Sequence, residues 1–204
     1  MVHLLLETDI VGAQEVYGID IDEKCLGSIP PPIRGLKFNL EELGQKKLPF
    51  PPKYFDLVTA VEVIEHLPYG DHLLMEVQRI LKPAGYFLVT TPNLASWLNQ
   101  IMLFFGYQPA YTEPSKYYLV DMRKVAKKSY ITDYCHKNLY TLRALKHMLE
   151  LYGFEIITAK GAQSHYDSFS WLPITNLPSL AHNIIVLVKV KCRENLRANL
   201  AKKG

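Results

Sequence analysis

The sequence predicts an α/β fold: a mostly parallel β-sheet covered by helices on both faces and closed by an antiparallel edge strand. Continuously apolar segments, typical of buried parallel strands, alternate with segments whose apolar residues recur at helical spacing. Near the end of the chain, two apolar segments follow one another with a loop and no clear helix between them. That pair is expected to form a hairpin at the sheet edge.

Six apolar segments are predicted to be strands, because they are short and bounded by turn-forming residues. They cover residues 16–21, 36–40, 54–61, 86–90, 154–159 and 183–190. Helices are expected over residues 2–13, 71–81 and 141–152. Pro83 ends the second of these helices and Gly153 the third. Residues 94–130 interrupt the alternation and are interpreted as an aromatic-rich insertion with some helix.

Length and composition indicate one globular domain. We expect it to cover residues 1–192, with residues 94–130 as a substrate-side insertion or lid and residues 193–204 as a polar, basic tail. A net charge of +3 is too weak to predict nucleic-acid binding. Three dispersed cysteines without a CxxC pair argue against a disulfide framework or a structural zinc site and favour a reducing cytoplasm. No apolar stretch is long enough to span a bilayer.

Polar residues follow three predicted strands, at the edge where open parallel sheets bind ligands. Asp20 closes the first strand, where a carboxylate can accept both hydroxyls of a ribose. Asn39 follows the second, where a side-chain amide could read an adenine edge. Both also suit plain capping or turn roles, and that alternative stays open. Val61 ends the third strand, and Glu62, Glu65 and His66 come directly after it.

Four motifs in order carry a resemblance to a known family. They are Val-Tyr-Gly-Ile-Asp-Ile-Asp (residues 16–22), Leu-Pro-Phe-Pro-Pro-Lys-Tyr-Phe-Asp-Leu-Val (48–58), Glu-Val-Ile-Glu-His-Leu (62–67), and Glu-Val-Gln-Arg-Ile-Leu-Lys-Pro-Ala-Gly (76–85) leading into Thr-Pro-Asn (91–93). The series closely resembles class I S-adenosylmethionine-dependent methyltransferases of Rossmann-like fold. Its nearest likeness is to the group around quinone-biosynthesis and glycan- or lipid-modifying methyltransferases. A nicotinamide dehydrogenase would share the ribose aspartate but has no place for the third and fourth motifs.

The resemblance implies S-adenosylmethionine as the cofactor. By position, Asp20 would hold the ribose and Ile21 would lie against the adenine. Asn39 and Leu40 would bound the adenine on its other side, and Val61 would lie near the methionine part.

The family places a Gly-x-Gly-x-Gly turn directly before the helix expected at residues 2–13, and this sequence begins inside that helix. The fold is therefore expected to be N-terminally incomplete and to lack a central strand. Two explanations compete: the protein extends upstream of this sequence, or it is a short form without catalysis that acts as a binding partner.

Glu62, Glu65 and His66 follow an i, i+3, i+4 spacing, so on a helix they would share one face. His66 is predicted to be the general base that takes a proton from a hydroxyl acceptor, with Glu65 beside it. We expect no metal. The alternative is a divalent cation, Mg²⁺, Mn²⁺ or Zn²⁺, on these three residues, because the pattern resembles that of small-RNA 2′-O-methyltransferases and some quinone O-methyltransferases.

The insertion follows a strand end on the ligand side, so it is expected to face the methyl acceptor. Its aromatic residues suit a small-molecule, lipid-linked or glycan acceptor and a peripheral membrane contact, with O-methylation as our prediction. Trp97 in the insertion and His136 after it are the predicted substrate residues. The alternative is that the aromatic side chains only pack the insertion onto the domain.

Overall fold

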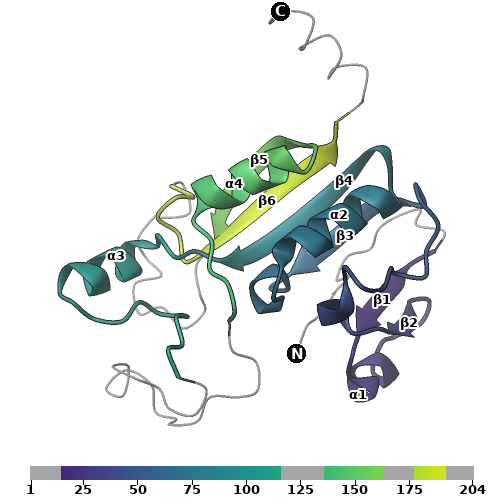
Figure 1. Ribbon diagram of the computed structural model, residues 1–204, viewed down its shortest axis with the longest axis horizontal. Helices are drawn as coiled ribbons and strands as arrows, with labels where there is room; N and C mark the ends of the chain where they lie inside the picture. The colour runs from purple at the N-terminus through teal and green to yellow at the C-terminus, as the bar shows by residue number, and fades with distance from the viewer. Residues whose placement is uncertain (1–14, 116–135, 163–176, 192–204) are drawn as a thin grey trace, which may run out of the picture.

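The computed structural model describes residues 15–115, 136–162 and 177–191 (Figure 1). Within them, six strands form two sheets. A two-stranded sheet pairs β1 (Tyr17–Asp20) with β2 (Arg34–Lys37). A four-stranded sheet has the order β3-β4-β6-β5, made of β3 (Phe55–Val61), β4 (Leu81–Pro92), β5 (Phe154–Ala162) and β6 (Asn183–Val190). The mixed α/β prediction is confirmed.

The predicted edge hairpin is present in the four-stranded sheet. Strands β3 and β4 are parallel, whereas β6 lies antiparallel to both of its neighbours, β4 and β5. The apolar side chains on one face of this sheet are fully buried, among them Phe87, Val89 and Val186. The sheet is therefore parallel apart from β6, which lies between β4 and β5 rather than at the edge, where the antiparallel strand was predicted.

Two helices cover the four-stranded sheet side by side (Figure 1). Helix α2 (Gly70–Ile80) buries Leu74 and Val77, and α4 (Leu142–Leu151) buries Leu145 and Leu149, all in the same core cluster. The Tyr152 hydroxyl donates to Asp71 Oδ1 at 2.7 Å and ties the end of α4 to the start of α2. Thr141 begins α4, because its side-chain oxygen accepts from the Ala144 amide at 3.2 Å.

The small sheet packs beside the start of β3. Tyr17 and Phe55 are the first residues of β1 and β3, and their rings lie 5.8 Å apart edge-on. Ile19 of β1 joins the common core with Ala60 of β3. Since both strands start at this aromatic contact and share a core further along, their carboxyl ends lie toward the same side. Helix α1 (Glu23–Gly27) crosses from β1 to β2.

Several predicted strand limits differ from the structure, and β5, for example, runs to Ala162 rather than ending at residue 159. The second strand covers Arg34–Lys37 rather than residues 36–40, because the Asn39 side chain caps the short helix η1 (Leu40–Glu42). Strand β4 begins at Leu81, directly after α2, and so includes Pro83. The predicted helix in the insertion is present as α3 (Trp97–Phe104). The helix expected at residues 2–13, the insertion beyond Ser115 and the tail from residue 193 lie outside the described residues.

Over the described ranges, every helix is too short or too polar to cross a bilayer.

Candidate functional site

The turn after β1 combines a buried carboxylate with an exposed apolar side chain. Asp20 is 6% exposed, and its Oδ1 accepts from the Asp22 amide at 2.8 Å. Asp22 in turn caps α1 by accepting from Lys24 N at 2.9 Å. Asp20 therefore does serve the turn, as the alternative interpretation expected, through one of its two oxygens. Ile21 is 50% exposed, which suits a side chain that packs on a flat ligand.

The turn after β2 lies against the turn after β1. The Phe38 amide donates to the carbonyl of Asp20, the predicted ribose ligand, at 3.0 Å. Asn39 is the residue after Phe38, so it lies close to Asp20. The Asn39 Oδ1 accepts from Glu41 N at 3.0 Å and caps η1. Leu40 is partly buried against the core. The predicted adenine residues thus border Asp20, while Asn39 also has the capping role expected of a turn residue.

The segment after β3 begins with a strained residue. Glu62 has φ +53, which is uncommon outside glycine and marks backbone held by its surroundings. Its amide donates to Thr90 Oγ1 at 3.1 Å, and that hydroxyl donates back to Glu62 Oε1 at 2.8 Å. Helix η2 (Ile64–His66) starts only afterwards. The three-residue helical face expected from the sequence is therefore not formed, because Glu62 precedes the helix and faces β4.

Glu65 is a fully buried carboxylate. Neither of its oxygens has a hydrogen-bond partner among the described residues. Burial, helped by the nearby Glu62 carboxylate, raises the pKa of Glu65 to about 8. Burial also raises the pKa of Glu62, although its Thr90 partner works against the shift. An ionised carboxylate that is buried without a hydrogen bond is unfavourable. Glu65 is therefore expected either to hold a proton or to bind a cation.

His136 comes from a distant part of the chain and completes the cluster. Its ring stacks on that of His66, with centroids 4.8 Å apart and an interplanar angle of 24°. One ligand atom from each of Glu65, His66 and His136 lies within 4.8 Å of the others. Backbone contacts hold the two segments together: the Glu65 carbonyl accepts from Lys137 N at 2.8 Å and Asn138 N at 3.0 Å.

A glutamate that the sequence did not single out anchors His136. Glu113 Oε2 accepts from the His136 amide at 2.7 Å, and Glu113 Oε1 lies 3.2 Å from His136 Nδ1. Burial lowers the pKa of His136, but the contact with Glu113 and its charge outweigh burial and raise it. No local pattern around Glu113 indicates this role, because the contact forms only in the folded chain.

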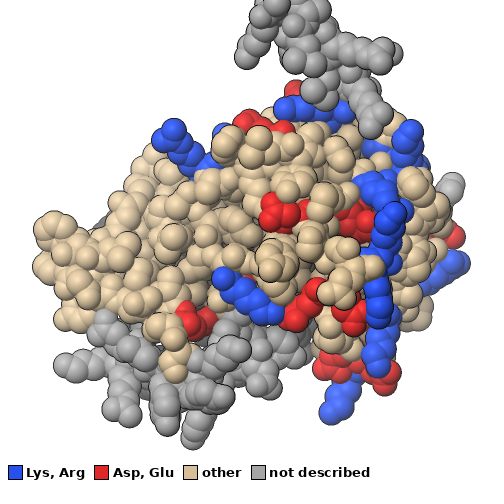
Figure 2. All heavy atoms as spheres, in the orientation of Figure 1, with Lys and Arg blue, Asp and Glu red and all other residues tan. Residues whose placement is uncertain are grey.

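A salt bridge joins this cluster to the adenine candidates. Lys137 Nζ donates to Glu41 Oε1 at 2.5 Å, and Glu41 belongs to the helix that Asn39 caps. The turns after β1, β2 and β3 are thereby linked through hydrogen bonds on one side of the molecule. Charged groups gather over β1 and β2 in Figure 2, whereas the opposite end of that face, over α3, carries none.

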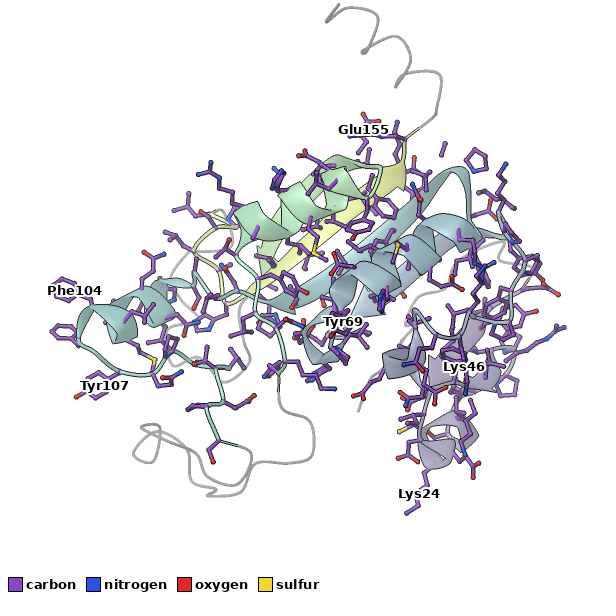
Figure 3. The ribbon with its side chains drawn as sticks, viewed as in Figure 1. Lys24, Lys46, Tyr69, Phe104, Tyr107 and Glu155 are labelled. Carbon is purple, nitrogen blue, oxygen red and sulfur yellow. The ribbon has the colours of Figure 1, made fainter. Side chains whose placement is uncertain are left out.

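Trp97 lies against the loop before β6. It begins α3, its amide donates to the Leu180 carbonyl at 2.9 Å, and its ring packs edge-on against His182. Further along, Phe104 and Tyr107 point outward at the far end of the helix (Figure 3). Phe104 is 83% exposed. Residues 116–130 of the expected lid lie outside the described residues.

Comparison of the sequence with known protein families identifies the family of this chain. A family described as a methyltransferase domain matches residues 3–159. The chain belongs to this methyltransferase domain family. The cofactor that the family uses is S-adenosylmethionine, which confirms the cofactor predicted from the sequence.

Curated relatives match short stretches. A probable S-adenosylmethionine-dependent methyltransferase of Mycolicibacterium smegmatis is 35% identical over 81 residues, or 40% of this chain and 31% of that protein. The ubiquinone biosynthesis O-methyltransferase of Dechloromonas aromatica is 32% identical over 97 residues, or 44% of this chain and 40% of that protein. The matched part of this chain thus spans less than half the length of either relative.

Solved structures share the fold. A putative S-adenosylmethionine-dependent methyltransferase from Listeria monocytogenes superposes with a TM-score of 0.58 at 15% identity, covering 89% of this chain and 82% of that one. A structure from Thermotoga maritima, described as a possible histamine N-methyltransferase, gives 0.55 at 18% identity, covering 85% and 72%. At this identity the likeness shows the Rossmann-like fold alone, and it confirms the fold class.

Proposed function

We propose that this methyltransferase transfers a methyl group from S-adenosylmethionine to a hydroxyl oxygen of a small-molecule, lipid-linked or glycan acceptor. The observation that carries the proposal is the cluster of the buried Glu65 with the partly exposed imidazoles of His66 and His136, at the carboxyl end of β3. Ligands of open α/β sheets bind at that edge. Oxygen is favoured over carbon or nitrogen because a hydroxyl acceptor needs a base, and the cluster offers two imidazoles.

The matched relatives include both an O-methyltransferase and C-methyltransferases of ubiquinone and menaquinone biosynthesis. A quinone-like ring is therefore one member of the proposed acceptor class. Exposed apolar side chains on α3 support an apolar acceptor, and a peripheral membrane contact remains part of the proposal.

Asp20 and its neighbours would hold the cofactor. A buried carboxylate at a strand end can accept two ribose hydroxyls, and Asp20 is the candidate. Ile21 would lie on one face of the adenine, with Asn39 and Leu40 at its other side. Val61 ends the strand nearest to the cluster and would border the methionine part. The position of these residues at the strand ends and the contacts between the three turns support these roles.

The chemistry asks little of the protein beyond alignment and one proton transfer. The sulfonium supplies the methyl group, and S-adenosylhomocysteine leaves. The acceptor oxygen forms the new O–C bond with its own electron pair and loses its proton to the His66 imidazole. Glu65 lies beside His66, with 4.0 Å between Glu65 Oε1 and His66 Nε2, and its carboxylate, ionised above its pKa of about 8, would stabilise the imidazolium that results.

A second role for the cluster is to hold a divalent cation. The donor set of one carboxylate and two imidazoles suits Mn²⁺ or Zn²⁺, and the partnerless carboxylate of Glu65 fits a ligand position. The structure brings His136 into this set in place of Glu62, which the sequence had suggested. A cation held there would lower the pKa of the acceptor hydroxyl.

Methyl transfer from radiolabelled S-adenosylmethionine to a panel of catechols, quinols, polyprenyl phenols and glycans tests the function. We expect label on a hydroxylated member, with the rate reduced at least about 100-fold in His66→Ala. His147→Ala, at an exposed position on α4, is the matched control and should keep the rate. Cofactor binding with no transfer to any member would favour the non-catalytic binding partner instead.

Titration with Mn²⁺ alone tests the cation role. Binding that is lost in Glu65→Gln and in His136→Ala, but kept in His147→Ala, would support it. Heat that is the same in all four proteins would reject it.

A further inference from the structure

Glu113 makes two contacts to one residue. Its Oε2 atom accepts from the backbone amide of His136 at 2.7 Å, and its Oε1 atom lies 3.2 Å from His136 Nδ1. Both side chains are largely buried, with 19% and 15% of their surface exposed. A paired contact of this kind fixes both the position of the backbone and the rotation of the ring, so His136 is held in one orientation.

The contact of His136 Nδ1 with Glu113 determines that Nε2 is the ring nitrogen left available. Because Nδ1 faces Glu113, it carries the proton in the neutral ring, and Nε2 is left as the acceptor or ligand atom. The inner face of the same ring stacks on His66. Carboxylates that receive the second nitrogen of a functional histidine fix its tautomer in this way at catalytic and metal sites.

The segment that carries Glu113 is itself held in place. The Ala110 amide donates to the buried side chain of Asn99 at 2.8 Å, which ties the segment to α3. Tyr111 has φ +66, a strained value for a non-glycine residue, and its ring packs edge-on against His136. Residues 94–112 contain no charged side chain, so Glu113 is the first charge after α3. A largely buried carboxylate at the end of an anchored segment, paired with one imidazole, indicates a specific role.

We propose that Glu113 is a positioning residue of the acceptor site, which fixes the Nδ1–H tautomer of His136 and presents Nε2 to the acceptor hydroxyl or to a cation. The inference rests on the proposed function for what Nε2 serves, while the Glu113–His136 pair itself is independent of it. It also makes the segment that follows α3 part of the site wall.

Nitrogen-correlated NMR of the imidazoles, on the full chain at alkaline pH, reads the tautomer directly. We expect the Nδ1–H form for His136 in the wild type and a return to the Nε2–H form in Glu113→Ala. Glu113→Gln keeps an oxygen acceptor and should retain the Nδ1–H form. Glu155→Gln, which removes an exposed ion pair with Lys189, is the control for loss of a glutamate. An Nδ1–H form that survives in Glu113→Ala would overturn the proposal.

Mn²⁺ affinity provides a second readout that needs no acceptor. If the cation role holds, Glu113→Ala should weaken Mn²⁺ binding by about 10–100-fold, as loss of such supporting carboxylates does. Equal affinity in Glu113→Ala and wild type would contradict the positioning role. If the wild type takes no Mn²⁺, the cation role fails, and the tautomer measurement still decides the role of Glu113. Amide spectra that match the wild type show that Glu113→Ala has folded.

Discussion

The imidazole of His136 stacks on that of His66, with 4.8 Å between the ring centroids. The two residues meet because the Glu65 carbonyl accepts from two successive amides, those of Lys137 and Asn138. Asn138 also donates through its side chain to the Leu67 carbonyl at 2.7 Å. The cluster is thus assembled largely by hydrogen bonds to the backbone carbonyls of Glu65 and Leu67.

The buried Glu65 predicts a pH-dependent stability. Its pKa is raised to about 8 in the folded chain, from 4.5 in the unfolded one, so the folded state binds the extra proton between these values. Stability is therefore full below pH 4.5 and falls as pH rises toward 8, by up to about 1.4 kcal/mol per pH unit. In Glu65→Gln this decline should be smaller, and the raised pKa of Glu62 accounts for what remains. Urea unfolding of both proteins from pH 5 to 9 measures it, and parallel curves would contradict the prediction.

Glu76 predicts the opposite dependence. Its carboxylate accepts from Leu48 N at 2.7 Å and pairs with Arg79. Burial raises the pKa of Glu76, but the Arg79 and Leu48 hydrogen bonds outweigh burial and lower it below 4.5. Its contribution is present above pH 4.5 and disappears in stronger acid. Glu76→Gln should therefore destabilise the chain at pH 7 and approach the stability of the wild type as the pH falls below 4.5, whereas Glu155→Gln should change stability little across this range.

Asn93 joins β4 to the loop before β6. This fully buried side chain donates to the carbonyls of Ser179 and Ala181, at 2.9 and 2.8 Å, and accepts from Ala95 N. Asn93→Ala would leave these groups without partners, and we expect a loss of about 2–4 kcal/mol in unfolding free energy. Gln100→Ala removes an exposed hydrogen bond to the same turn and should cost less than about 0.5 kcal/mol. Chemical denaturation of both variants distinguishes the two costs, and similar losses would count against the assignment.

Gly70 begins α2 where no side chain fits. A Cβ at this position would lie 2.6 Å from the Tyr140 hydroxyl and 3.0 Å from Ile64 Cγ1. Gly70→Ala should therefore displace Tyr140 and destabilise the chain by about 1–3 kcal/mol. At Gly27, in α1, the same substitution meets nothing within 4 Å and should be neutral or stabilising. Thermal unfolding compares the two, and an equally tolerated Gly70→Ala would show that Tyr140 can move freely.

The elements that have a local sequence pattern could be predicted from the sequence. Strands β3 and β6 and helix α4 form where apolar periodicity and turn residues predict them, and the hairpin of β5 and β6 follows from the loop between them. The limits of β2 were wrong because the capping preference of Asn39 prevailed over the apolar run.

In the candidate site, too, a local motif predicts some residues, whereas others meet only through tertiary contacts. Glu65 and His66 are adjacent in sequence and could be named from a motif. The approach of His136 depends on the Glu65 carbonyl, and its anchoring depends on Glu113, beyond α3. Such contacts arise from tertiary packing and leave no periodic or spacing signal.

Calorimetric titration with S-adenosylhomocysteine tests the central claim most directly. If the chain binds its cofactor at the end of β1, the wild type should bind in the micromolar range. Asp20→Ala should weaken binding at least about 10-fold, because a charged hydrogen-bond acceptor is lost. Asp56→Ala, which removes a largely exposed partner of Lys82, should bind as the wild type does. A folded wild type that gives no heat, or an Asp20→Ala variant that binds equally well, would contradict the account.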